Sequence, residues 1–318
     1  MRYEKKVAIL GGCLAGLLAI WGAGMIFSPE RSAARSESRM LLAGKIEDAA
    51  SIEIGGPKLS MTREGGAWFL VEASAKLPVQ DARIKSFLEA LASVKRLRPM
   101  SKSKDAWKSL NLDEGKAKAI IVKDGKGRTM ADLAVGGYGP TGGETYLRLG
   151  GSEAAYAAEG SFASYASSPR SSWLDLRILP APPAEGDVQA IAIKSSLALD
   201  GAGKPAQKFD YSLRRQGEGW TGIAGTIDPT AVSALARSIV NLEGEDIVSA
   251  PPASAFSPVA ARIELSLGNG QGKVLEIGTP AGEGRFHARL AGGAYVYAVS
   301  AYGLRNALKA PADLLAKK

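Results

Sequence analysis

The stretch Gly65-Gly66-Ala67-Trp68 returns 152 residues later as Gly217-Glu218-Gly219-Trp220. Each copy follows a charged, strand-like segment, and an amphipathic helix is predicted to begin about a dozen residues after it. Self-similarity at a fixed spacing is typical of a duplicated structural unit. The sequence therefore predicts one fold that occurs twice in the chain.

The helix predicted after each copy carries apolar residues at helical spacing, which indicates that one face packs against a core. The first helix is expected to begin at Asp81. The second is expected to begin at Asp228, an N-cap residue that is followed by proline at the first helical position. The apolar stripes are Ile84, Phe87, Leu88, Leu91 and Val94 in the first helix, and Val232, Leu235, Ile239 and Leu242 in the second.

Strand-like segments follow each helix in the same order, and each copy closes with a short helical segment led by Ser161 or Ser300. These patterns predict an α+β fold class, with two homologous α+β modules built on antiparallel sheets. We place the modules at residues 45–180 and 181–318, joined by the proline-rich stretch 180–186. The matching strand segments are 118–123, 130–135 and 145–149 in the first module and 261–267, 274–277 and 286–290 in the second.

The N-terminus contains 21 consecutive uncharged and mostly apolar residues, Val7 to Phe27. A helix of that length spans a hydrocarbon core of about 30 Å, so we predict an N-terminal transmembrane helix that acts as a signal-anchor. A cleaved signal peptide is the alternative, although its apolar part is usually shorter. The expected topology is a cytoplasmic tail at residues 1–6, an anchor at 7–27, a polar tether at 28–44, and the folded part outside the cytoplasm, in the cell envelope or periplasm.

Composition excludes several classes of protein. The chain has 318 residues, 46% of them hydrophobic, with one Cys and one His. A single Cys excludes a disulfide framework and a cysteine-based zinc cluster, and a single His leaves most metal and acid/base sites without their commonest member. We expect no catalytic residue, no cofactor and no metal site.

Individual motifs agree with that expectation. The pattern Gly-x-Gly-x-x-Gly at residues 137–142 precedes a predicted strand rather than the helix that a dinucleotide site needs, so a hairpin loop is the better interpretation. His287 is expected to be a polar surface or edge residue that shares a sheet face with Arg289. Trp68 and Trp220 occupy the same place in both copies, which favours a shared core role. Trp107 and Trp173 either cap the core or line a groove.

The net charge is +8, and the excess is local. Residues 45–180 contain 20 basic and 16 acidic residues, whereas residues 181–318 contain 14 and 13. The excess lies in a basic stretch after the first predicted helix, at residues 95–108, whereas the stretch after the second predicted helix carries Glu243, Glu245 and Asp246. The basic stretch is therefore a possible partner-binding patch for anionic lipid or an acidic partner, or simply a solvated face. We do not expect nucleic-acid binding. The patch consists of Lys95, Arg96, Arg98, Lys102, Lys104 and Lys108.

Four features recur as a set: the Gly-x-x-Trp strand, the helix after an Asp or Pro start, the segment from Val135 to Leu149 containing GGETYLRL, and Trp173-Leu174-Asp175. Together they resemble the motifs of the DUF4340 family of bacterial membrane-anchored proteins. The resemblance implies a protein that is encoded beside the permease and ATPase of an ABC-type system similar to the gliding-motility transporters.

The expected function is therefore that of a non-catalytic, membrane-anchored accessory or scaffold protein of an ABC-type transport complex. Its expected partners are the membrane, through a single span, and the permease and ATPase subunits. The alternative is an envelope module that binds a glycan or lipid without a transporter. An envelope hydrolase, with His287 or a pair of carboxylates at its centre, is a third possibility.

Overall fold

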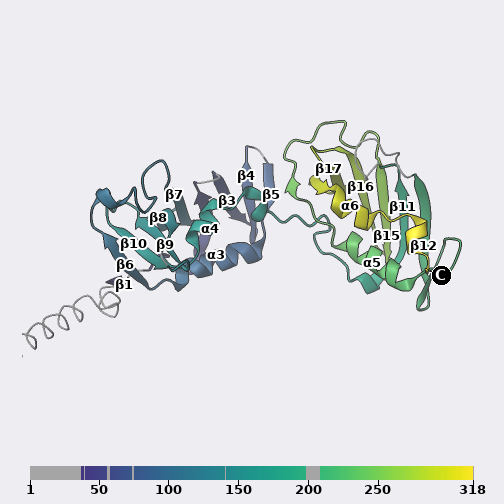
Figure 1. Ribbon diagram of the computed structural model, residues 1–318, viewed down its shortest axis with the longest axis horizontal. Coiled ribbons are helices and arrows are strands. Elements are labelled where there is room, and N and C mark those ends of the chain that lie inside the picture. The colour runs from purple at the N-terminus through teal and green to yellow at the C-terminus, as the bar shows by residue number, and fades with distance from the viewer. Residues whose placement is uncertain are drawn as a thin grey trace, which may run out of the picture. The chain divides into compact units, whose positions relative to one another are not determined.

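The computed structural model describes residues 37–38, 40–55, 58–73, 75–139, 141–197 and 208–317. The chain divides into two compact units (Figure 1). Unit 1 is Met1–Leu70 with Gln80–Arg170, and unit 2 is Val71–Val79 with Ser171–Lys318.

The first sheet has ten strands in the order β1-β6-β10-β9-β8-β7-β2-β3-β4-β5, and the pairings described between its strands are antiparallel. Its inward residues alternate with outward ones, as Ile52, Ile54 and Met61 show by being almost fully buried. The strands are β1 (Glu37–Ser38), β2 (Ala49–Ile54), β3 (Leu59–Glu64), β4 (Ala67–Glu72), β5 (Ala75–Pro78), β6 (Arg96–Ser101), β7 (Lys118–Asp124), β8 (Thr129–Tyr138), β9 (Glu144–Leu149) and β10 (Ala155–Glu159).

Two helices cover one face of this sheet, α3 (Asp81–Ser93) and α4 (Phe162–Ser167) (Figure 1). The predicted apolar stripe of α3 is buried, and the rings of Phe87 and Tyr165 meet edge-on at 5.1 Å. Leu41 and Leu42, which lie in the predicted tether, are also buried. The remaining elements of this part of the chain are the 3-10 helices η1 (Ile46–Asp48), η2 (Lys104–Ala106) and η3 (Arg170–Ser172).

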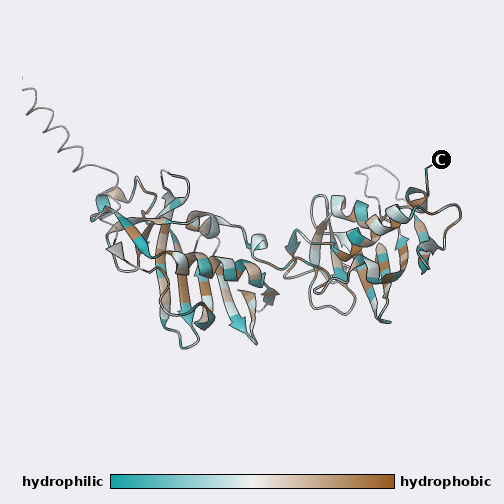
Figure 2. Cartoon of the chain, turned by 90° about the horizontal axis from the view of Figure 1, so that it is seen from below, coloured by the Kyte–Doolittle hydropathy of each residue, from teal (hydrophilic) through white to brown (hydrophobic). Residues whose placement is uncertain are grey.

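The second sheet has eight antiparallel strands in the order β13-β12-β11-β15-β16-β17-β18-β14. Along β15 the burial alternates strictly, with Ile263 and Leu265 inside and Arg262 and Glu264 outside. Figure 2 shows the same banding of hydrophobic and hydrophilic residues along the strands. The strands are β11 (Val188–Ser195), β12 (Phe209–Gln216), β13 (Gly219–Thr221), β14 (Asp246–Ile247), β15 (Ala261–Leu267), β16 (Gly272–Pro280), β17 (Arg285–Leu290) and β18 (Tyr297–Ser300).

Helices α5 (Pro229–Val240) and α6 (Ala301–Ala307) pack against each other on one face of the second sheet (Figure 1). The Asp228 side chain caps α5 by accepting a hydrogen bond from the Thr230 amide at 2.8 Å. The Ser300 hydroxyl caps α6 through the Gly303 amide at 3.2 Å. Two 3-10 helices complete the unit, η4 (Glu185–Asp187) and η5 (Pro311–Leu314).

The two sheets share one strand order. Read from one edge, the first runs β6-β10-β9-β8-β7-β2-β3-β4 between its additional outer strands β1 and β5. The second, read in the same sense, runs β14-β18-β17-β16-β15-β11-β12-β13. Strands at the same position in the two series also follow each other in the same order along the chain, so that β2 corresponds to β11 and β10 to β18.

The predicted fold class is wrong. Strand makes up 41% of the described residues and helix 20%, so the chain is mostly β-sheet, with two antiparallel sheets, rather than α+β. The physical reason is that each sheet carries only one helix of more than two turns, whereas short strands that the sequence analysis did not delimit, such as β6 and β14, add to both sheets.

The predicted N-terminal transmembrane helix, residues 7–27, lies outside the described residues. Among the residues that the structure does describe, no helix is both long and apolar enough to cross a bilayer.

Candidate ligand-binding sites

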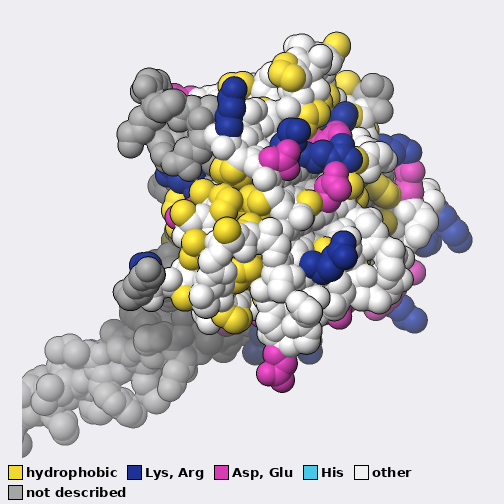
Figure 3. Space-filling model, turned by 90° about the vertical axis from the view of Figure 1, so that its right-hand side faces the viewer, with side chains coloured by type: hydrophobic (Ala, Val, Ile, Leu, Met, Phe, Trp, Pro, Cys, Tyr) yellow, Lys and Arg dark blue, Asp and Glu magenta, His cyan; other side chains and the backbone are white. Residues whose placement is uncertain are grey.

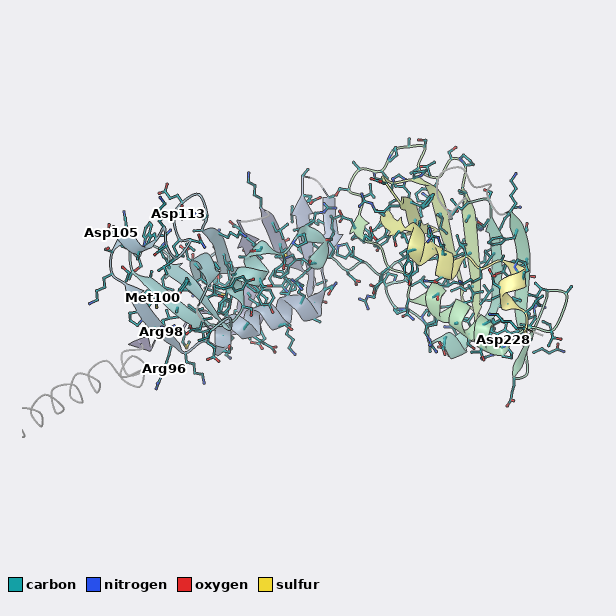
Figure 4. All side chains as sticks on the ribbon, viewed as in Figure 1. Arg96, Arg98, Met100, Asp105, Asp113 and Asp228 are labelled. Atoms are coloured by element: carbon teal, nitrogen blue, oxygen red, sulfur yellow. The ribbon has the colours of Figure 1, made fainter. Side chains whose placement is uncertain are left out.

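The basic stretch begins just before β6 and continues through that strand and the loop after it, at one end of unit 1 (Figure 4). Two of its six cations form ion pairs: Arg98 with Glu144 at 2.6 Å, and Lys104 with Glu153 at 3.1 Å. The other four are exposed and make no ion pair with another described residue. The predicted patch is thus reduced to Lys95, Arg96, Lys102 and Lys108.

The loop after β6 is held against the outer face of the sheet by Trp107. The Arg148 guanidinium lies 3.7 Å from the centre of the indole ring, and the indole nitrogen donates a hydrogen bond to the Glu153 carbonyl at 2.8 Å. Leu110 and Leu112 pack beside it. Trp107 therefore anchors a surface loop.

Unit 2 uses the same arrangement. Phe256, on the loop before β15, stacks on Arg289 at 4.0 Å, and Arg289 is the counterpart of Arg148. In both units a carbonyl of this loop accepts a hydrogen bond from an amide at a strand bulge. In unit 1 the Gly137 amide of β8 donates to the Leu110 carbonyl at 3.0 Å. In unit 2 the Thr279 amide of β16 donates to the Ala255 carbonyl at 2.8 Å.

Glycine is required beside each bulge because the loop backbone lies so close to the strand that a side chain would not fit between them. A methyl group on Gly136 would overlap the carbonyl oxygen of Leu110, and one on Gly278 would overlap that of Ala255. The invading loops thus explain why both copies have glycine at this point of the strand.

His287 is buried on an interior strand and only 4% exposed, so the expectation of a surface or edge residue is wrong. Its Nδ1 lies 3.0 Å from the Thr279 carbonyl oxygen, to which it donates, and its ring contacts Phe256. The shared sheet face with Arg289 is as predicted, because both side chains meet Phe256. These contacts give His287 a role in positioning the loop.

Glu276 joins three strands of the second sheet. It accepts from Arg289 at 2.8 Å and lies 3.4 Å from Arg262, which also pairs with Glu264 at 2.6 Å. Because each of these charges has an opposite neighbour, the row stabilises the sheet face. Figure 3 shows such interspersed basic and acidic side chains on the face turned to the viewer.

The glycine pattern at residues 137–142 begins at the end of β8 and leads into the hairpin connection to β9, as predicted. The Gly139 amide donates to the Glu144 carbonyl at 2.8 Å, and a strand follows directly. A helix N-terminus that could hold a pyrophosphate does not follow this loop.

The two repeated tryptophans are buried at equivalent places, as predicted. Trp68 faces Arg63 across the hairpin β3–β4, and Trp220 faces Arg215 across β12–β13. Trp173, which the sequence left undecided, is fully buried in unit 2.

Perturbed pKa values belong to structural contacts. Burial, and secondarily Asp175, raise the pKa of Tyr297 to about 12. Burial also raises the pKa of Tyr211, whose hydroxyl donates to the Lys309 carbonyl at 2.8 Å. Both hydroxyls therefore stay protonated at neutral pH.

Unit 1 contains a cavity of about 420 Å³ that sequence reasoning missed. It lies between η1, the β3–β4 hairpin and the first half of α3. A cavity of this size falls within the usual range for small-ligand sites, about 300–1,000 Å³. Its walls are formed by Ile46, Glu47, Arg63, Gly66, Trp68, Asp81, Ala82, Ile84, Lys85 and Leu88.

Unit 2 contains a cavity of about 460 Å³ at the end of β11 and the starts of β12 and β15. Lys194 and Asp210 pair across its rim at 3.2 Å, and Arg262 is held by two glutamates. Its remaining lining includes Lys208, Phe209 and Val259. Within the described ranges, no group of three or more His, Cys, Asp or Glu side chains could hold a metal ion.

No curated protein and no solved structure matches the chain. Residues 68–259, which extend from Trp68 of the first repeat to the loop before β15, match a family described as a domain of unknown function (DUF4340). This match covers more than half of the sequence, and the chain belongs to the DUF4340 family.

Proposed function

We propose that the protein is a non-catalytic accessory or scaffold protein of an ABC-type transport complex and that it acts by binding a partner. One observation carries the binding role: Lys95, Arg96, Lys102 and Lys108, at one end of unit 1, are exposed and form no ion pair with another described residue. Such a surface attracts an acidic partner.

Comparison of the repeats supports the choice of this surface. The equivalent place in unit 2, after α5, carries Glu243, Glu245 and Asp246. The two copies thus share a scaffold but differ in the sign of charge at one place. A surface that only kept the protein in solution would not need opposite signs at equivalent places, whereas two different partners would.

The location and the transport complex belong to the proposal as well. The apolar residues 7–27 support attachment to the cell membrane with the folded units outside the cytoplasm. The permease and ATPase partners rest on the resemblance to the DUF4340 family alone.

The test is crosslinking in the native membrane with a tag at Lys318, followed by identification of the copurified proteins. Recovery of permease and ATPase subunits supports the proposal. A variant with Lys95, Arg96, Lys102 and Lys108 changed to Glu should recover at least tenfold less. The matched control changes four exposed lysines elsewhere, Lys45, Lys126, Lys208 and Lys317, to Glu.

Equal recovery with both variants would show that the basic surface is not the contact. Recovery of neither subunit with the unaltered chain, under conditions that preserve known complexes, would refute the accessory role.

A second candidate function is that of an envelope module that binds a glycan or lipid. The cavity in unit 1 favours it, because the cavity combines an apolar wall with a polar rim.

A further inference from the structure

We propose that the cavity of unit 1 binds a neutral, hydroxyl-rich ligand, namely one or two saccharide rings. This inference deepens the second candidate function, and it does not depend on the transport complex. It rests on the walls of the cavity, on the balance of charge at its rim, and on a comparison with the equivalent place in unit 2.

The wall is apolar on one side. The buried side chains of Trp68, Ile84 and Leu88 line the cavity, together with half-buried Ile46. An apolar surface of this kind packs against the C–H face of a sugar ring, and burial of that face contributes favourable free energy.

The rim is polar and has no net charge. Arg63 and Lys85 supply two cations, and Glu47 and Asp81 supply two carboxylates. This balance disfavours an anionic lipid or a phosphate, which would meet both carboxylates at close range. A sugar hydroxyl both donates and accepts hydrogen bonds, so it can pair with each of the four groups.

The rim groups retain capacity for a ligand. Arg63 uses Nη1 for the Glu47 carbonyl at 3.0 Å and Nε for the Gly66 carbonyl at 3.5 Å, which leaves the Nη2 donors available. Lys85 lies 3.9 Å from Glu89, which is longer than a hydrogen bond. Among the described residues, the Glu47 and Asp81 side chains have no hydrogen-bond partner.

In unit 2 a salt bridge spans the equivalent place. Arg215 donates to the Gly186 carbonyl at 2.7 Å, as Arg63 does to Glu47, so η4 corresponds to η1. Arg237 of α5 then reaches Glu185 of η4 with two hydrogen bonds of 2.6 and 3.0 Å. In unit 1 the same positions hold Ile46 and Glu89, which cannot pair, and the space between η1 and α3 stays open.

The test transfers this salt bridge into unit 1 with Ile46→Glu and Glu89→Arg. The full chain is purified in a detergent without a sugar headgroup and titrated with glucose, maltose, N-acetylglucosamine and sucrose up to about 50 mM, because single-sugar sites are commonly weak. Binding is followed by saturation-transfer NMR. We expect at least one sugar to bind and its affinity to fall at least tenfold in the double variant.

The matched control makes the reverse exchange in unit 2, Glu185→Ile with Arg237→Glu, and should bind as the unaltered chain does. A second variant guards against misfolding: Lys85→Met, on a side chain that is 73% exposed, should weaken binding several-fold, whereas Lys126→Met should not. Melting curves check that the variants are folded.

The inference is overturned if none of the four sugars binds the unaltered chain. It is also overturned if a sugar binds but both the Ile46/Glu89 variant and Lys85→Met retain full affinity, because the ligand would then lie elsewhere. Neither result bears on the crosslinking test of the transport complex, so the two proposals fail separately.

Discussion

Unit 1 and unit 2 have the same strand order and the same way of holding a loop on the outer face of the sheet, yet they differ in charge at several equivalent positions. In both, a glycine at a strand bulge admits a loop carbonyl, and an arginine stacks on a loop aromatic residue. The shared positions are those where close packing leaves few alternatives.

The differences lie at positions that the scaffold leaves free. The row Arg262, Glu276 and Arg289 crosses unit 2 as a chain of ion pairs, whereas the counterpart row in unit 1 is Ala119, Ala134 and Arg148. Similarly, η4 is tied to α5 by a salt bridge, but the corresponding gap in unit 1 is an open cavity. The duplicated fold thus keeps its packing and changes its surface chemistry.

The largest effect is expected at the two bulge glycines. Gly136→Ala and Gly278→Ala should each destabilise their own unit by about 3 kcal/mol, because the added methyl group displaces the docked loop. Hydrogen exchange measured by mass spectrometry assigns the loss of protection to one unit or the other.

The controls for this pair are Gly143→Ala and Gly272→Ala, where no atom crowds the new methyl group. Each should change stability by less than about 1 kcal/mol. If the bulge variants behave like these controls, the loops are not docked as described.

The next effect separates the two arginines. Arg289→Met should lower the free energy of unfolding by about 2 kcal/mol. The change removes the nearer ion-pair partner of Glu276, whose side chain is only 12% exposed, and it also removes the stacking of Arg289 on Phe256. Arg148→Met should cost about 1 kcal/mol, since it loses mainly the stacking on Trp107. Unfolding in urea, which does not screen charges, measures the loss of stability in both variants. Equal losses of stability would contradict the role assigned to Glu276.

Sequence patterns predicted those elements whose signals are local. Helix α3 begins at Asp81 and β15 spans 261–267, both as expected from apolar periodicity and capping residues. Strand β6 was missed because its six residues include two arginines and Pro99, which do not resemble a strand. The contact between Trp107 and Arg148 joins distant residues, so no local pattern indicates it.

The cavity was also beyond sequence reasoning. It stays open because Ile46 and Glu89 stand where unit 2 has the salt-bridged pair Glu185 and Arg237. The equivalence of these positions becomes visible only in the structure, where an arginine contacts η1 and η4 in the same way. The basic stretch, by contrast, was found from charge alone, but its pairing with Glu144 and Glu153 was not. Composition shows which charges exist, and only the fold shows which of them are already paired.

A smaller effect is expected at the helix starts. Asp228 caps α5, whereas Gln80 at the same position of α3 makes no side-chain capping hydrogen bond. Asp228→Gln should destabilise unit 2 by about 1 kcal/mol, and Gln80→Asp should stabilise unit 1 by about 0.5 kcal/mol. Thermal unfolding of both variants would contradict this comparison if the two shifts had the same sign.

The smallest effect is the pH dependence of the salt bridge that only unit 2 has. The hydrogen bonds from Arg237 hold the pKa of Glu185 below its ordinary value of 4.5. A lowered pKa in the folded state adds stability above the ordinary value, and this stability is lost as the pH falls through the folded pKa. The unaltered chain should therefore be more stable than Arg237→Gln at neutral pH, and the difference should disappear in acid.

Because both side chains are exposed, salt should weaken the difference in stability as well. Hydrogen exchange of α5 and η4, followed from neutral to acidic pH in both proteins, measures this difference. A gap between the two proteins that stayed constant down to strongly acidic pH would show that Arg237 stabilises unit 2 by packing rather than by its charge.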